Sequence, residues 1–238
     1  YENGFTGGEG SALPTSFEFT LVASNFNPDL PDPTAIPIDA TNFPDDGFRE
    51  FITYNLDQNE DGTLSQWEID AVTKLNLNPN FYIEGITPVA YIFSLDGIEY
   101  FQNLAWLDIS NQAITSIALT DNPNLKTLIM NTEIGGYIHS FFLSPAIQLD
   151  SLKVSGIDFS FPLNLSEQTN LRYVIYRGEN NPEIDLSQCN KLTYLDCAST
   201  AWKNLDLSQH PDLQHLDCSG TQIQSGNRSA DLGRLRRQ

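Results

Sequence analysis

Residues 57–68, DQNEDGTLSQWE, have oxygen-bearing side chains at regular intervals and could bind a metal ion. The stretch matches the calcium-loop pattern D-x-[DN]-x-[DN]-G-x5-E at every specified position. Those positions are Asp57, Asn59, Asp61, Gly62 and Glu68. A hard cation needs six or more oxygens from a short arc of chain; alternate residues supply them, and a glycine permits the sharp turn. This spacing predicts a calcium site of the EF-hand type.

Two more residues complete the expected oxygen shell. Thr63 would contribute its backbone carbonyl, and Ser65 stands at a position that often acts through a water molecule. The expected ligands of a structural calcium ion are therefore Asp57, Asn59, Asp61, Thr63, Ser65 and Glu68. The alternative is an acidic loop that joins two helices and holds no metal. A sensor role is not expected, because sensors use paired loops and a methionine-rich groove, whereas this chain has one such loop and one methionine.

The residues on both sides of the loop show the spacing of apolar side chains that is typical of helices. They are Phe48, Phe51 and Ile52 before the loop and Ile69, Val72 and Leu75 after it. Asp45 or Asp46 can cap the start of the first helix. We therefore expect a helix–loop–helix unit over residues 41–76, in which the ion would lock the two helices together.

A repeated pattern follows this unit and decides the fold. Segments of the form L-x-x-[LV]-x-[apolar] lie 21, 24, 22, 21 and 21 residues apart. They begin at Leu104, Leu125, Leu149, Leu171, Leu192 and Leu213. The alternation indicates a short strand whose inward side chains fill a core, and one repeat cannot bury its own apolar face, so the repeats must stack. Residues 72–77, VTKLNL, fit as an earlier repeat.

The late repeats, LTYLDCASTAWKNLDLS (192–208) and LQHLDCSGTQI (213–223), resemble the leucine-rich-repeat family, and more narrowly secreted or cell-surface bacterial proteins of that family. The resemblance covers roughly residues 40–223. It implies an α/β fold, a right-handed solenoid with about seven short parallel strands on a concave sheet, behind a small helix–loop–helix N-terminal cap. It also implies a bacterial lipoprotein or other surface protein.

The asparagine usually found nine residues into each repeat of that family is absent here. The residues in its place are Gln112, Glu133, Ile157, Glu179, Thr200 and Thr221. A continuous asparagine ladder between adjacent backbones is therefore not expected. Thr and Gln can substitute in part, but Ile157 cannot. The middle repeats, residues 125–170, also vary in length, which predicts bulged loops there.

The expected boundaries follow from these patterns. Residues 1–40 form a flexible N-terminal segment, residues 41–76 the cap, residues 72–225 the solenoid and residues 226–238 a basic C-terminal tail. Residues 16–24 alternate as a strand does, and could pair with the solenoid or belong to a neighbouring domain. The tail is either a makeshift cap on the last repeat or the scar of a truncation. The polar, glycine-rich start indicates a trimmed chain with a lipid anchor upstream, or else a cytoplasmic protein with a loose terminus.

The composition narrows the classes of partner. With 31 acidic and 12 basic residues, the formal charge is −19, which disfavours nucleic acid and anionic membrane. No run of 18 apolar residues is present, so membrane insertion is not expected. Cys189, Cys197 and Cys218 have no metal-ligand spacing, and the repeats place all three in the core as small hydrophobes. The calcium loop favours an extracellular or cell-surface location.

The outward strand positions are the candidate binding residues. Aligned repeats bring these positions together on the concave face, where rigid aromatics with a polar end favour binding. The candidates are Trp106, Tyr173, Ile175, Tyr194 and His215. We therefore predict a non-enzymatic module that binds a protein or a glycan. The alternatives are a structural or spacer domain without a tight ligand and, more remotely, an enzyme, although no nucleophile, base and orienting group form a recognisable pattern.

Overall fold

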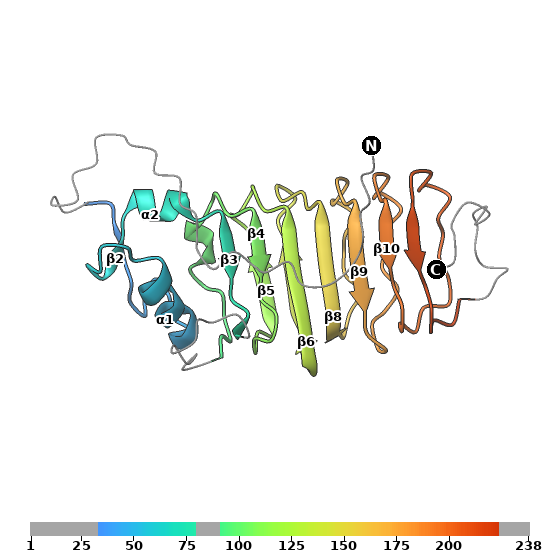
Figure 1. Cartoon of the computed structure of the whole chain (residues 1–238), viewed down its shortest axis with the longest axis horizontal. Helices are drawn as coiled ribbons and strands as arrows, with labels where there is room; N and C mark the ends of the chain where they lie inside the picture. Colours follow the sequence, from blue (N-terminus) through green and yellow to red (C-terminus); the bar gives the residue numbers. More distant parts are fainter. Residues whose placement is uncertain (1–32, 80–90, 224–238) are drawn as a thin grey trace, which may run out of the picture.

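The computed structural model describes residues 33–79 and 91–223. Figure 1 shows two helices at one end, α1 (Asp46–Asn55) and α2 (Gln66–Ala71), followed by strands that lie side by side in chain order. A short 3-10 helix, Ile98–Tyr100, lies between the first two repeats. No helix in this part of the chain is both long and apolar enough to cross a membrane. The strand expected at 16–24 and the basic tail at 226–238 lie outside the described residues.

Seven parallel strands form the main sheet, as the repeat pattern predicted. From the N-terminal end they are β3 (Lys74–Asn76), β4 (Trp106–Asp108), β6 (Thr127–Ile138), β8 (Ser151–Phe159), β9 (Tyr173–Arg177), β10 (Tyr194–Asp196) and β11 (His215–Asp217). The register aligns equivalent positions of successive repeats, so that Leu107 lies beside Leu128, and Leu195 beside Leu216. Each strand therefore adds one step to a continuous stack.

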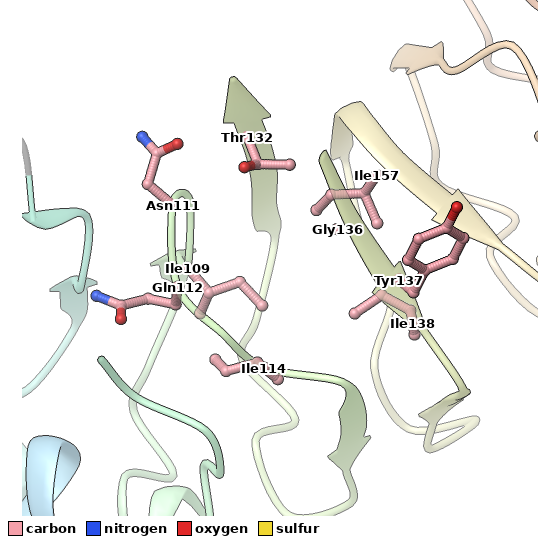
Figure 2. Close-up of a pocket in the computed structure, with 9 residues that line it drawn as sticks. All are labelled: Ile109, Asn111, Gln112, Ile114, Thr132, Gly136, Tyr137, Ile138 and Ile157. Carbon is pink, nitrogen blue, oxygen red and sulfur yellow. The ribbon is translucent and has the colours of Figure 1, made fainter. Parts of the chain in front are cut away.

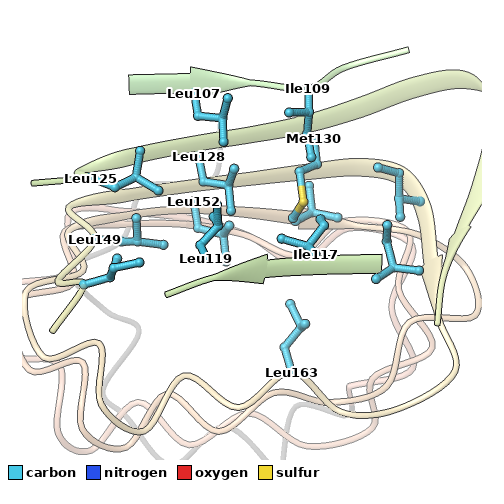
Figure 3. Close-up of a cluster of buried hydrophobic side chains, with 14 of the residues drawn as sticks. Leu107, Ile109, Ile117, Leu119, Leu125, Leu128, Met130, Leu149, Leu152 and Leu163 are labelled. Atoms are coloured by element: carbon cyan, nitrogen blue, oxygen red, sulfur yellow. The ribbon is translucent and has the colours of Figure 1, made fainter. Parts of the chain in front are cut away.

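The core runs along the inner side of this sheet, where the leucines of successive repeats are stacked (Figure 3). Leu107, Leu128 and Leu152 are adjacent in the register and completely buried. Burying one such side chain contributes roughly 1.5–3 kcal/mol relative to leaving it in water. The alternation of the strands thus produces one extended apolar core rather than separate cores for each repeat.

Two of the three cysteines are part of this core, as expected. Cys189 and Cys197 are fully buried, whereas Cys218, in the last described repeat, is half-buried. Burial raises the pKa of the Cys197 thiol to about 12 and that of Cys189 to about 11. Both thiols therefore remain protonated at neutral pH and act as apolar filling.

The middle repeats are irregular, in agreement with the uneven spacing. Strands β6 and β8 are long, and their register shifts between Asn131 and Gly136. Gly156 on β8 has a positive φ of 71°, and a Cβ there would overlap the Thr132 carbonyl. The same repeats form a second, two-stranded parallel sheet from β5 (Ser116–Leu119) and β7 (Ser140–Leu143).

Buried polar side chains connect neighbouring repeats, although no continuous asparagine ladder is present. In four repeats, the side chain three residues before the first leucine contacts a carbonyl of the preceding repeat. Asn122 reaches Ile98 O at 2.8 Å, and Gln168 reaches Ile147 O at 3.0 Å. At this position the later repeats have Cys189, whose Sγ lies 3.6 Å from Gln168 O, and His210, whose Nε2 lies 3.0 Å from Leu186 O. This column was not expected from the sequence.

The residues at the expected ladder positions differ in whether they bridge neighbouring repeats. Gln112 does bridge repeats, because its side chain donates to Leu77 O and accepts from Ile92 N–H. Thr200 and Thr221 instead bond within their own repeats, to the carbonyls of residues 197 and 218. At Ile157 the bridging group comes from elsewhere: Asn181 donates to Ile157 O at 2.8 Å and accepts from Phe159 N–H at 2.9 Å.

Contacts from Asp45 and Phe43 attach the cap to the first repeats. Asp45 accepts from Phe48 N–H at the start of α1 and from the backbone of Phe93 and Ser94, 48 and 49 residues later. The buried Phe43 ring packs on Tyr100 and Phe101 in the 3-10 region. These contacts fix the helix pair on the N-terminal end of the solenoid core.

Candidate binding face and calcium loop

The outward third positions of the strands form one continuous column on the main sheet, which we call the strand column. In register order its members are Lys74, Trp106, Thr127, Ser151, Tyr173, Tyr194 and His215. All of them are half-buried, with their inward neighbours in the core. Four of the five predicted binding residues, Trp106, Tyr173, Tyr194 and His215, are therefore brought onto one line.

The three rings at the C-terminal end of the column are stacked face to face. The ring centroids of Tyr173 and Tyr194 are 4.2 Å apart at an interplanar angle of 17°, and those of Tyr194 and His215 are 4.1 Å apart at 6°. These spacings follow from the roughly 4.8 Å between neighbouring strands. Burial and the neighbouring Tyr173 raise the pKa of Tyr194 to about 12, so its hydroxyl is neutral and able to donate at physiological pH.

The fifth predicted residue, Ile175, lies in a second column beside the first. It is half-buried and in register with Lys153 on one side and Asp196 on the other. Asp196 is almost fully buried, and its carboxylate also accepts from Ala198 N–H at 3.1 Å. The three aspartates of this column, Asp108, Asp196 and Asp217, thus accept a backbone hydrogen bond at the ends of β4, β10 and β11.

Arg177 is a residue of this face that the sequence reasoning missed. Its guanidinium forms a two-point interaction with Asp196, with Nε to Oδ1 at 2.9 Å, and lies 4.0 Å from Asp217. The bond to Asp196 raises the pKa of Arg177 above its ordinary value. The alternation of a strand could have predicted this residue. Arg177 lies two positions beyond Ile175, so its side chain is on the same side of the sheet as the aspartates.

The candidate calcium ligands run from Asp57, after the end of α1, to Glu68 in the first turn of α2. Asp57 accepts from Asp61 N–H at 3.2 Å and from Gly62 N–H at 2.9 Å, and Gly62 has a φ of 79°. The hydroxyl of Thr63 donates to Asp61 at 2.7 Å and lowers the pKa of that carboxyl. Leu64, the eighth residue of the loop, is completely buried. The turn is therefore built as the pattern requires.

Glu68 has a second task in this arrangement. One carboxylate oxygen accepts from Gln58 N–H at 2.7 Å, and the other accepts from the backbone and hydroxyl of Ser65 at 2.8 and 2.6 Å. The Ser65–Glu68 pair is a capping box for α2. The donor types fit calcium, but among the described residues no group of three or more His, Cys, Asp or Glu side chains is placed to hold a metal ion.

A strand from outside the loop completes this unit. β1 (Ile36–Pro37) pairs antiparallel with β2 (Thr63–Leu64), and Ile38 N–H donates to Gly62 O at 3.0 Å. This short ladder holds the second half of the loop.

A small hollow lies where the register of β6 and β8 shifts (Figure 2). Its residues are Ile109, Asn111, Gln112, Ile114, Thr132, Gly136, Tyr137, Ile138 and Ile157. The free space is about 20 Å³, on the order of one water molecule. It follows from the bulge and is too small for an organic ligand.

Solved structures share this architecture. The functional domain of InlJ from Listeria monocytogenes is 20% identical, with a TM-score of 0.56, over 84% of this chain and 46% of InlJ. InlP from the same organism is 20% identical, with a TM-score of 0.55, over 80% of this chain and 55% of InlP. The fold is a leucine-rich-repeat solenoid. The chain spans about half the length of both structures. No protein-family model matches it, and neither does any curated protein.

Proposed function

We propose that the chain is a non-enzymatic binding module whose strand column contacts a protein partner outside the cell. The observation that carries the proposal is the stack of Tyr173, Tyr194 and His215 beside the half-buried Ile175. Rigid, amphipathic rings give a large contact area at low entropic cost, which is why such residues dominate protein interfaces. The solenoid fold shared with the internalins InlJ and InlP supports a protein partner over other classes.

A structural or spacer domain is the alternative, since stacked rings also stabilise neighbouring strands by about 0.5–1.5 kcal/mol per pair. The two functions differ in what removal of the rings would do. A spacer would lose stability only, whereas a binding face would lose affinity by more than the change in stability explains.

The test is an array of extracellular protein domains and glycans probed with the wild type and with Tyr173→Ala/Tyr194→Ala. We expect at least one protein on the array to lose tenfold or more in affinity with the double variant, because central aromatic residues contribute about 2 kcal/mol or more each. Binding is measured by surface plasmon resonance on the recovered domains.

The matched control is Tyr54→Ala/Tyr91→Ala, which removes two exposed tyrosines that are not on the strand column. This control should keep full affinity. If the wild type and both variants recover the same set with the same affinity, the strand column is not a binding face and the spacer function is favoured.

We also propose that the loop at residues 57–68 binds a structural calcium ion, with Asp57, Asn59, Asp61, Thr63, Ser65 and Glu68 as ligands. The proposal is supported by the oxygen donors at alternate positions and by the turn at Gly62, which the Asp57 carboxylate holds. The ion would take over the Glu68 carboxylate from the capping box and lock α1 to α2. Its expected affinity is that of extracellular modules, roughly 10⁻⁴ to 10⁻³ M.

Glu68→Gln removes the charge that calcium needs, and it keeps only one of the two oxygens that accept hydrogen bonds from Gln58 and Ser65. Without calcium, this variant should therefore melt below the wild type, so the calcium response of each protein is compared with its own calcium-free Tm. With 10 mM calcium, we expect the wild-type Tm to rise and that of Glu68→Gln to stay constant, by mass action. Scanning calorimetry with calcium and with chelator measures both. A wild type that does not respond would leave Glu68 with its capping role only.

A further inference from the structure

The stacked rings of the strand column cover one another's faces. With centroids 4.1–4.2 Å apart, Tyr194 has a ring on each side and exposes only its edge and hydroxyl. Tyr173 has Tyr194 on one face, and Ser151 is its neighbour on the other side. A ligand that needs an aromatic face therefore finds none in the middle of the stack.

The ring of Tyr173 has one face towards the small Ser151, and the ring of Trp106 likewise has one face towards the small Thr127. Lys74 Nζ lies 4.2 Å from the centre of the Trp106 ring and covers one side of the indole, while Thr127 is the neighbour on the other side. Between the two aromatics the column has only the small side chains of Thr127 and Ser151. We call these four residues the aromatic interval. Three strand spacings separate its ends, about 14 Å.

Positively charged side chains lie next to the aromatic interval, although the chain as a whole has a formal charge of −19. Of the twelve basic residues, five lie on strands of the main sheet or directly before them: Lys74, Lys126, Lys153, Arg172 and Arg177. Lys153, beside Ser151, and Arg172, before Tyr173, have no side-chain hydrogen bond or ion pair within the described residues. The nearby carboxylates are Asp150, before Ser151, and the buried Asp108, two residues beyond Trp106. Together they carry two negative charges against the four positive charges of Lys74, Lys126, Lys153 and Arg172, so the region is net positive.

We propose that the aromatic interval is the anchor point for an acidic protein segment, an inference that rests on the proposed binding function. An apolar side chain of the partner lies on Thr127 and Ser151 between the two ring faces. A neighbouring carboxylate of the partner pairs with Lys153. The cations complement an acidic partner, and the small side chains leave room for one protruding residue.

The probe is a library of random 12-residue peptides displayed on phage and selected on the wild-type chain. Selected peptides are synthesised, and their affinities are measured by fluorescence anisotropy. We expect enrichment of Asp and Glu next to an apolar residue, with binding that weakens as salt rises.

Ser151→Trp fills the interval and continues the ring stack, so it should block the anchor point without destabilising the sheet. We expect at least a tenfold loss of peptide affinity. Lys153→Gln should weaken binding about threefold to fivefold, as for an exposed ion pair. Ser140→Trp, which adds the same bulk on β7 of the other sheet, should leave affinity unchanged.

The outcomes separate this proposal from the binding function on which it rests. If the selected peptides no longer bind Tyr194→Ala but still bind Ser151→Trp, the anchor point is wrong and the strand column remains a binding face. A selection that returns no peptide sensitive to either variant contradicts both. Peptides without acidic enrichment overturn the charge assignment. If hyaluronan fragments bind and Ser151→Trp abolishes that binding while no peptide is selected, the partner is an acidic glycan rather than a protein.

Discussion

The Asn181→Ala variant should melt about 6–12 °C below the wild type. Asn181 is almost fully buried, donates to Ile157 O at 2.8 Å and accepts from Phe159 N–H at 2.9 Å. Alanine would leave both backbone groups without a partner inside the protein, at a cost of about 3 kcal/mol. For a domain of this size, each kcal/mol lowers the Tm by roughly 2–4 °C. Circular dichroism melting measures the shift.

The neighbouring residue provides the control. Asn180 is exposed, and its side chain bonds to Asp158 at the surface at 2.7 Å. Asn180→Ala should therefore change the Tm by no more than about 1–2 °C, because an exposed hydrogen bond is replaced by water. Equal losses for the two variants would show that the buried bridge from Asn181 is not what stabilises these repeats.

Gly97→Ala should lower the free energy of unfolding by about 3–5 kcal/mol. Gly97 has a φ of 101°, which strains any other residue. In addition, a Cβ at this position would lie 2.6 Å from the Asn42 carbonyl oxygen and would overlap the ring of Phe43. The variant forces the cap away from the first repeats. Urea titration, followed by fluorescence, measures the loss.

Gly135→Ala separates backbone strain from steric overlap. Gly135 has a similar positive φ of 78°, but no heavy atom lies within 4 Å of the place where its Cβ would be. Its substitution should cost only about 1–2 kcal/mol, the usual penalty for a left-handed residue. If Gly97→Ala costs no more than this, the cap does not press on the solenoid at Gly97.

The repeat spacing was sufficient to predict the main sheet, because a 21-residue period with inward leucines has few other solutions. It was not sufficient to predict the bridging side chains. Counting nine residues from Leu171 gives Glu179, whereas the bridging residue is Asn181, since β9 runs to Arg177 before the chain turns. Gln112, which follows the shorter strand β4, lies where the count predicts and does bridge.

The candidate binding face could also be predicted from the sequence only in part. Register alone placed Tyr173, Tyr194 and His215 on one line, and they are stacked. What register could not supply was the direction of the ring faces, which depends on side-chain rotamers and on which neighbours are small. The pairing of Arg177 with Asp196 was missed for a related reason, because it joins two strands at unequal positions. Calcium binding stays a prediction of the loop pattern.

We expect the order and the unequal lengths of the strands to affect how the described sheet opens in solution. β6 and β8 are 12 and 9 residues long, whereas β3 and β11 at the two ends have 3 residues each. In a solenoid each repeat contacts only its neighbours, so opening begins at the ends and moves inwards. The backbone amides of β3 and β11 then exchange with solvent through separate local openings. We expect those of β6 and β8, in the middle of the described sheet, to exchange more slowly, because their neighbours on both sides must open first.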